Sequence, residues 1–141
     1  MNVLSPEPLS QDEISTQVPI LMYHHLSEDV TNSEMVSPEQ FEAQIRALSE
    51  AGYTGVSFDE LQAYVLRGEP LPEKPVVITF DDGYRSNYTL AYPILQKYGM
   101  KATIFAIGVS FGTDHYKDTD YAITPHFGAA EAAEMTASGL I

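Results

Sequence analysis

The chain has 141 residues, enough for one domain, and 44% of them are hydrophobic, so a buried core can form. Twenty aspartates and glutamates stand against seven lysines and arginines, which gives a formal net charge of -13. A surface this acidic repels phosphate backbones, so we expect no nucleic-acid partner. Because the sequence has no cysteine, it excludes disulfides and thiolate metal ligands.

The first part of the chain differs in composition from the rest. Residues 1–18 are rich in proline, serine and acidic residues, and they lack the charged start and apolar stretch of a signal peptide. No segment of the sequence approaches the roughly 20 apolar residues that span a membrane. We therefore expect a flexible leader at 1–18 and one partial domain at 19–141.

The first half of this domain alternates between short apolar runs and helical patterns. We expect strands at 19–23, 53–56 and 75–80. Helices are expected at 38–51 and 58–67, and loops at 24–36 and 69–75. Ser37 with Gln40 and Ser57 with Glu60 have the spacing of helix capping boxes. The last strand has no alternation, which is typical of a strand buried on both faces of a parallel sheet.

The second half continues the alternation. We expect helices at 86–98 and 129–138, and a long loop at 108–124. A strand is expected at 102–107, and another should begin at 140–141. Pro93 should kink the first of these helices or mark a late restart. Strands that alternate with helices predict βαβ units, so we expect an α/β fold whose functional groups gather at the carboxyl ends of the strands.

Polar residues follow two of the expected strands. His24 and His25 come after the first strand, and Asp81, Asp82 and Gly83 follow the strand at 75–80. Two neighbouring carboxylates raise each other's pKa unless a cation lies between them. Adjacent residues leaving a strand point to opposite sides, so one carboxylate could bind a metal ion while the other stays free as a base. From spacing alone, Asp82-Gly83 could equally be a simple turn.

The longer string that holds these aspartates is more specific. Residues 79–88, TFDDGYRSNY, resemble the first motif of the polysaccharide deacetylases, the family 4 carbohydrate esterases with the NodB homology fold. Residues 19–107 also resemble the branch of poly-N-acetylglucosamine deacetylases, with LMYH near the start and AGYTGVSFDEL further on. The resemblance implies the N-terminal part of a distorted (β/α) barrel.

The resemblance also implies an activity and residue roles. The family hydrolyses the N-acetyl group of an N-acetylglucosamine-containing polysaccharide with a divalent metal, usually zinc. Carried over to this sequence, Asp81 is the catalytic base, Asp82 is a metal ligand, and His24 is the acid that protonates the leaving amine, with His25 as a weaker candidate. The implied location is extracellular or at a bacterial cell envelope.

The sequence departs from the family pattern at its end. The family's second metal motif, His-(Ser/Thr)-x-x-His, does not occur in the sequence, and His115 and His126 lack its spacing, so we expect both in loops. By resemblance the chain stops just before that motif. We therefore expect no stable zinc and no activity from these residues alone. We also expect an open sheet edge that favours self-association.

A non-catalytic reading stays open. The chain could be a carbohydrate-binding or interaction remnant of the same fold. Phe111, Tyr116 and Tyr121 in the long loop suit stacking on sugar rings, although such aromatic residues more often anchor a loop. A phosphatase with an Asp-x-Asp nucleophile motif is excluded because Phe80 stands where that motif needs aspartate.

Overall fold

The computed structural model describes residues 17–141. The leader expected at 1–18 lies almost entirely outside the described residues. The strands are β1 (Ile20–Tyr23), β2 (His25–Leu26), β3 (Met35–Val36), β4 (Thr54–Gly55), β5 (Pro75–Asp82) and β6 (Thr103–Ala106). The helices are α1 (Pro38–Glu50), α2 (Phe58–Arg67), α3 (Tyr92–Tyr98) and α4 (Ala129–Ala137), with a π-helical turn at Asn87–Ala91 and a 3-10 turn at Gly108–Ser110.

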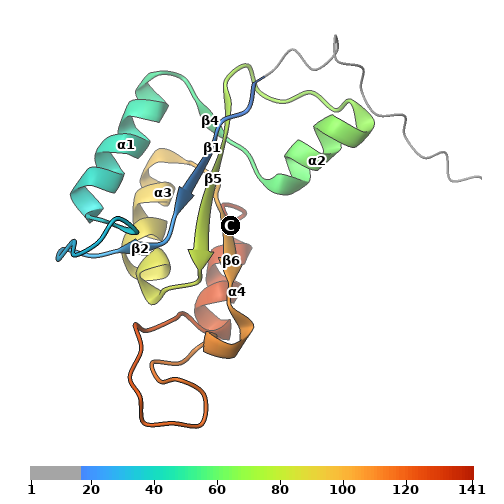
Figure 1. The fold of residues 1–141 in the computed structure, drawn as a ribbon. Coiled ribbons are helices and arrows are strands. Elements are labelled where there is room, and N and C mark those ends of the chain that lie inside the picture. The colour runs from blue at the N-terminus through green and yellow to red at the C-terminus, as the bar shows by residue number, and fades with distance from the viewer. Residues whose placement is uncertain (1–16) are drawn as a thin grey trace, which may run out of the picture.

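The main sheet is parallel and is built around β5 (Figure 1). Strand β1 pairs with one edge of β5, and β4 and β6 pair in succession with the other edge. Residues 75–80 of β5 are all buried, as expected for a central strand of a parallel sheet. The prediction of an α/β fold with a parallel sheet is confirmed.

Both expected capping boxes form. The Ser37 hydroxyl accepts a hydrogen bond from the Gln40 amide at 3.1 Å, and the Ser37 amide donates to Gln40 Oε1 at 3.4 Å, at the start of α1. Ser57 and Glu60 make the same reciprocal pair at the start of α2. Each cap satisfies amides that a helix terminus would otherwise leave unpaired, typically stabilising a helix by about 1 kcal/mol.

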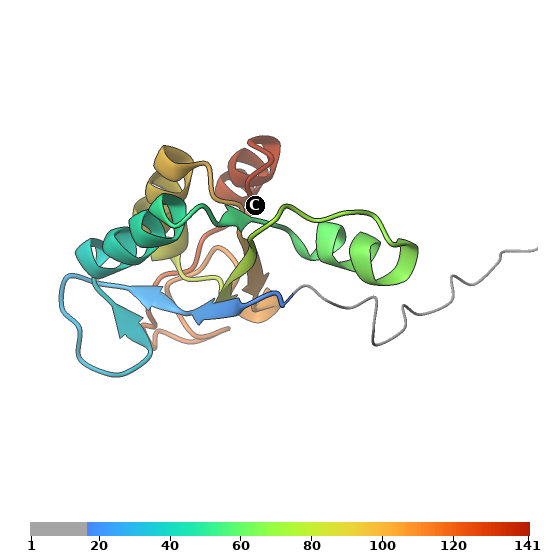
Figure 2. The same ribbon diagram turned by 90° about the horizontal axis from the view of Figure 1, so that it is seen from above.

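One face of the sheet is covered by helices. Figure 2 shows α1, α3 and α4 on the same side of the strands. The rings of Tyr23 and Phe80 from the sheet pack against Phe41 of α1, with centroids 5.0 to 5.6 Å apart, and Ile45 and Leu95 complete this core. Burial of each such side chain contributes roughly 1.5–3 kcal/mol.

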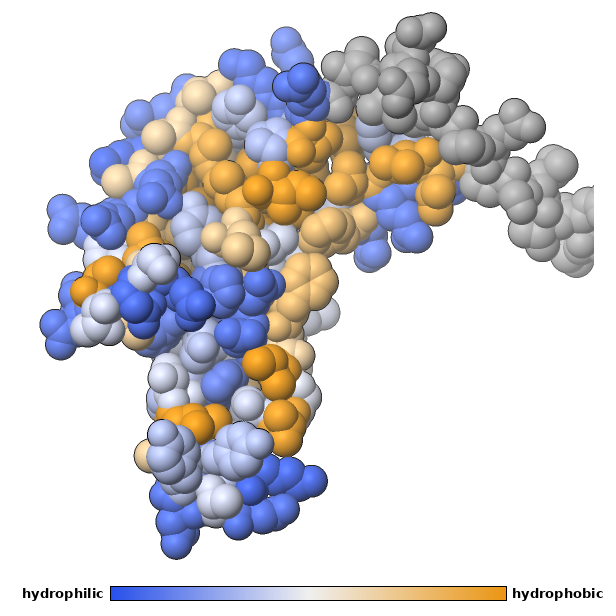
Figure 3. Space-filling view, in the orientation of Figure 1, coloured by the Kyte–Doolittle hydropathy of each residue, from blue (hydrophilic) through white to orange (hydrophobic). Residues whose placement is uncertain are grey.

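The opposite face is largely open. Ile20, Met22 and Phe105 point to this side and keep 53%, 66% and 52% of their surface exposed. Figure 3 shows apolar side chains gathered over the strands and along one side of the molecule. No helix among residues 17–141 has both the length and the hydropathy of a membrane span.

Two details of the expected elements are wrong. The segment 24–36 is not only a loop, because β2 and β3 pair in parallel within it and tie its two ends together. Residues 140–141 do not form a strand, since a single backbone hydrogen bond, from the Ala102 amide to the Leu140 oxygen at 2.8 Å, joins them to the chain before β6. A single backbone hydrogen bond does not make the repeated pairing of a β-strand.

The helix expected at 86–98 is continuous but irregular before Pro93. A π-helical turn at Asn87–Ala91 precedes α3, and the Tyr92 amide donates to the Asn87 oxygen, one residue further back than in an α-helix. Proline has no amide hydrogen to offer to the preceding turn, and the helix accommodates Pro93 with a π-turn and not with a break.

Candidate active site

His24 and Asp81 lie together at the carboxyl ends of β1 and β5. Tyr23 pairs with Phe80 in the parallel register, so the next residue of each strand lies at the same level and on the same open face. His24 Nε2 is 3.7 Å from Asp81 Oδ2, and the side chains keep 21% and 32% of their surface exposed. An imidazole and a carboxylate at this distance, open to solvent, can exchange protons with a bound substrate or water.

Asp82 and Gly83 form a tight left-handed turn. Their φ angles are 73° and 78°, and such a φ is uncommon for a residue with a side chain. A Cβ atom at Gly83 would lie 2.9 Å from the Cβ of Ala106, so only glycine fits beside β6. The turn predicted for Asp82-Gly83 therefore exists, and it changes the direction of the chain directly after Asp81.

Two buried polar residues hold the segment that carries His24. Asn87 Nδ2 donates to the His24 oxygen at 2.8 Å, and the Ser86 hydroxyl accepts from the Leu26 amide at 3.1 Å. Ser86 and Asn87 are only 7% and 1% exposed. Neither residue is predicted from the sequence to belong to the site. The signal that was available is two consecutive polar residues at the start of a buried helical turn, directly after the aspartate motif.

The second histidine of the pair faces a different partner. His25 Nδ1 lies 2.8 Å from the Ser86 hydroxyl, and its ring stands 5.0 Å from that of Tyr84. The Tyr84 ring in turn stands 4.9 Å from His126. Burial lowers the pKa of His25, and the nearby His126 lowers it further. The environment therefore favours the neutral form of His25.

His126 is buried, although its sequence context predicts an ordinary loop residue. It is 5% exposed, its Nδ1 has no hydrogen-bond partner among residues 17–141, and its backbone forms a bridge with Tyr84. His115 is half-exposed and pairs with Asp114. Spacing alone could not separate these two histidines, because the packing of a long loop decides their burial.

Burial and two acidic residues act on the Tyr84 hydroxyl. Burial raises the pKa of Tyr84, and the carboxylates of Asp82 and Glu34 raise it further. The phenol is therefore neutral at ordinary pH and can donate a hydrogen bond.

The chain matches the family model described as polysaccharide deacetylase over residues 68–141, more than half of its length. The chain belongs to the polysaccharide deacetylase family. The matched region contains Asp81 and Asp82 but not His24, so the place of His24 in the site rests on the geometry above.

Curated relatives extend this match. The Bacillus subtilis protein YxkH, which carries the same family name, is 46% identical over 104 residues, 74% of this chain and 37% of that protein. The poly-beta-1,6-N-acetyl-D-glucosamine N-deacetylase of Escherichia coli K12 is 34% identical over 116 residues, 74% of this chain and 17% of that protein. The chain therefore spans well under half the length of these relatives.

A solved structure supports the fold of this deacetylase-family chain. The de-N-acetylase from Aggregatibacter actinomycetemcomitans superimposes with a TM-score of 0.73 at 27% identity, over 87% of this chain and 52% of that one. The prediction of a NodB-type α/β fold, of which the chain covers a part, is confirmed.

The described residues do not by themselves form a zinc centre. Among residues 17–141, no three side chains of histidine, cysteine, aspartate or glutamate lie close enough together to hold one metal ion. Catalytic zinc sites in proteins use three such ligands. Asp82 as a metal ligand therefore stays a prediction.

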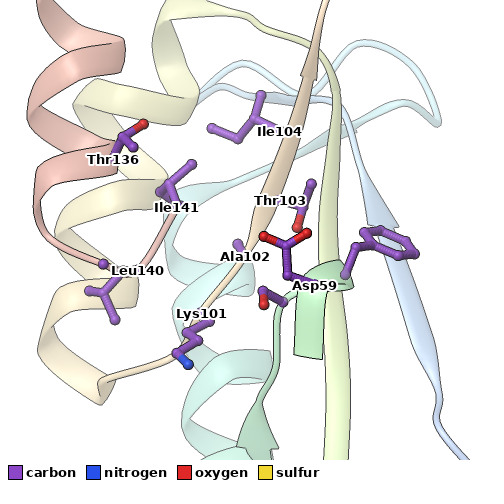
Figure 4. Close-up of a pocket in the computed structure, with 11 residues that line it drawn as sticks. Asp59, Lys101, Ala102, Thr103, Ile104, Thr136, Leu140 and Ile141 are labelled. Carbon is purple, nitrogen blue, oxygen red and sulfur yellow. The ribbon is translucent and has the colours of Figure 1, made fainter. Parts of the chain in front are cut away.

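A cavity lies beside the first residues of β6, away from the carboxyl ends of the strands. It measures about 460 Å³ and is lined by residues from the start of α2, from residues 101–104 and from the end of the chain (Figure 4). None of His24, Asp81 and Asp82 lines it. The predicted site residues therefore lie at the carboxyl ends of the strands and outside this cavity.

Proposed function

We propose that this chain serves in the hydrolytic removal of N-acetyl groups from a polysaccharide of N-acetylglucosamine. The observation that carries the proposal is the pair of His24 and Asp81, 3.7 Å apart at the open ends of β1 and β5, in a chain of the polysaccharide deacetylase family. Relatives named poly-beta-1,6-N-acetyl-D-glucosamine N-deacetylase, from Escherichia coli and Staphylococcus aureus, support this substrate class. We also propose, from the family resemblance of the sequence, a role at the cell envelope or outside the cell.

The reaction needs one group that takes a proton and one that gives it. Water adds to the amide carbon, the carbon–nitrogen bond breaks, acetate leaves and the amine gains a proton. Asp81 suits the base that takes the proton from water, because a carboxylate accepts it readily. His24 suits the acid that protonates the amine. Their separation lets the substrate amide lie against both groups.

Dependence on a divalent metal, zinc by resemblance, is part of the proposal, with Asp82 as one ligand. Such an ion would polarise the amide carbonyl. Because the described residues offer fewer than three ligands in one place, each proton transfer above is assigned to side chains of this chain alone.

The test is acetate release from a β-1,6-linked N-acetylglucosamine oligomer by the full gene product. Asp81→Asn should lower kcat/KM by about 100- to 10,000-fold, the range for loss of a general base. His24→Gln should fall by a similar factor, and the double variant should be little worse than either single one, because the two groups act together. Asp29→Asn, an exposed acid in a nearby loop, is the matched control. Near-full activity of Asp81→Asn removes Asp81 from this role.

A carbohydrate-binding module without catalysis is the second candidate. The exposure of Tyr116 and Tyr121, at 61% and 73%, favours it, because exposed aromatic rings can stack on sugars. Phe111 instead packs edge-on against Phe127 at 5.7 Å and anchors the loop. Oligosaccharide binding that persists in Asp82→Ala but is lost in Tyr121→Ala would favour the module over the enzyme.

A further inference from the structure

A small cavity opens directly beside the His24 side chain. It measures about 160 Å³, the share of roughly five water molecules in the liquid, which is room for part of a sugar unit. Its walls come from three separate parts of the chain. The segment between β1 and α1 supplies His24, His25, Asn32, Glu34 and Met35, Tyr84 follows the aspartate turn, and Thr124 belongs to the long loop.

The segment that carries Glu34 is fixed by backbone pairing. The Ser27 amide donates to the Val36 oxygen at 3.1 Å, and the parallel pairing of β2 with β3 returns the loop to the site. Asn32 Oδ1 accepts from the Glu34 amide at 2.9 Å and sets the last turn of the loop. Glu34 thereby lines the cavity, and the residue stays exposed to solvent.

The cavity is acidic on one side and aromatic on the other. No ion pair within residues 17–141 includes Glu34. The Tyr84 ring forms a flat wall 5.0 Å from the His25 ring, and its hydroxyl lies in the field of Glu34 and Asp82. His24, His25 and Glu34 share the cavity, but they do not form a group that could hold a metal ion. A larger cation with an apolar face fits these walls better.

We propose that this cavity is a subsite for a glucosamine unit whose amine is free and cationic, next to the acetylated unit that reacts at His24 and Asp81. The inference rests on the proposed function and names the neighbouring unit that the site prefers. Glu34 would pair with the ammonium group, and the Tyr84 ring would face the C–H surface of the sugar. An acetylated unit in the same place would leave Glu34 without a cation.

The direct test measures binding of two small sugars to the full gene product. Methyl β-D-glucosaminide and its N-acetyl counterpart are titrated at neutral pH, and the ring protons of the histidines are followed by NMR. The free amine should bind about two- to fivefold more tightly, the range for an exposed ion pair, and the difference should shrink in high salt. Equal affinity for the two sugars would overturn the proposal.

Variants of the loop acids assign the effect. Glu34→Gln should erase the preference for the free amine, and Glu34→Lys should reverse it by like-charge repulsion. Glu28→Gln is the matched control, because Glu28 is an exposed acid of the same loop that does not line the cavity. A preference that survives in both Glu34 variants would also overturn the proposal.

A kinetic comparison separates this inference from the proposed function. The ratio of kcat/KM for a partly deacetylated oligomer over a fully acetylated one should fall in Glu34→Gln and stay unchanged in Glu28→Gln. If the wild type releases no acetate from any oligomer, the proposed function fails, and the binding difference alone decides the subsite. If acetate is released with the same ratio in every variant, the subsite fails and the deacetylase stands.

Discussion

The two faces of the central sheet are built from alternate residues of the same strands, and they differ in burial and in the side chains that they present. On the face covered by α1 and α3, Tyr23 and Phe80 pack with Phe41 in a closed aromatic cluster. On the other face, Met22 remains 66% exposed, His24 directly follows β1, and Asp81 is the second-last residue of β5.

This contrast shows how one strand can serve two purposes. Successive side chains of a strand point to opposite sides, so a buried residue is followed directly by one that is free to act. Tyr23 and Phe80 anchor the strand ends from the covered side and thereby fix the level of His24 and Asp81. A core residue, Tyr23 or Phe80, is therefore followed directly by a candidate site residue, His24 or Asp81.

The largest expected effect tests the covered face. Phe41→Ala should lower the free energy of unfolding by about 3–5 kcal/mol, because it removes a fully buried ring and leaves a cavity. Met22→Thr on the open face should change it by less than about 0.5 kcal/mol. Urea unfolding of both variants gives the comparison. Similar losses in the two variants would mean that the open face is covered in solution.

The second test concerns the residue that holds His24 from the buried side. Asn87→Ala removes the bond to the His24 oxygen and should cost about 1–3 kcal/mol of stability. Because His24 then loses its fixed level beside Asp81, acetate release should show a lower kcat with a smaller change in KM.

Thr89→Ala is the control for this test. Thr89 is exposed on the same helical turn, and its hydroxyl donates only to the Arg85 oxygen. An Asn87→Ala variant that is less stable but keeps the wild-type kcat would show that Asn87 supports the fold alone and does not position His24.

The third test concerns self-association through the open sheet, which stays a prediction. Exposed apolar side chains beside an unpaired strand edge favour pairing with a second copy. Light scattering after gel filtration should show a mass for residues 1–141 that rises with concentration. Ile20→Thr combined with Met22→Thr should reduce this rise. A constant monomer mass over a wide concentration range would contradict it.

The smallest expected effect is a dependence of stability on pH through His25. The pKa of His25 is lowered from 6.5 in the fold, chiefly by burial. Below 6.5 the unfolded chain therefore binds more protons than the folded one, so stability is complete above this pH and declines as the pH falls. His25→Gln should flatten the decline between about pH 7.5 and 5.5 in urea unfolding. An unchanged slope would show that His25 is not its source.

Most of the local structure could be predicted from the sequence. The capping residues Ser37 and Ser57 fix the starts of α1 and α2, because their hydroxyls pair with amides three residues away. The irregular helix before Pro93 follows from the missing amide hydrogen. These features involve neighbours along the chain, which is why a sequence shows them.

The candidate site also has features that the sequence predicts and features that only the tertiary structure shows. The string that contains Asp81 and Asp82 indicates the family by itself, and the match over residues 68–141 confirms it. The burial of Asn87 and His126, and the return of Glu34 to the site, depend on residues that are distant in the sequence.

The sequence alone determined the strand and helix pattern, the family motif and the polar residues at the strand ends. Only the tertiary structure decided that His24 stands 3.7 Å from Asp81, that the buried Asn87 and Ser86 side chains hold the segment that carries His24, and that Glu34 lines a cavity beside it. The physical reason is that hydrogen bonding to near neighbours is encoded locally. The register of parallel strands and the path of a long loop are fixed only when the whole core packs.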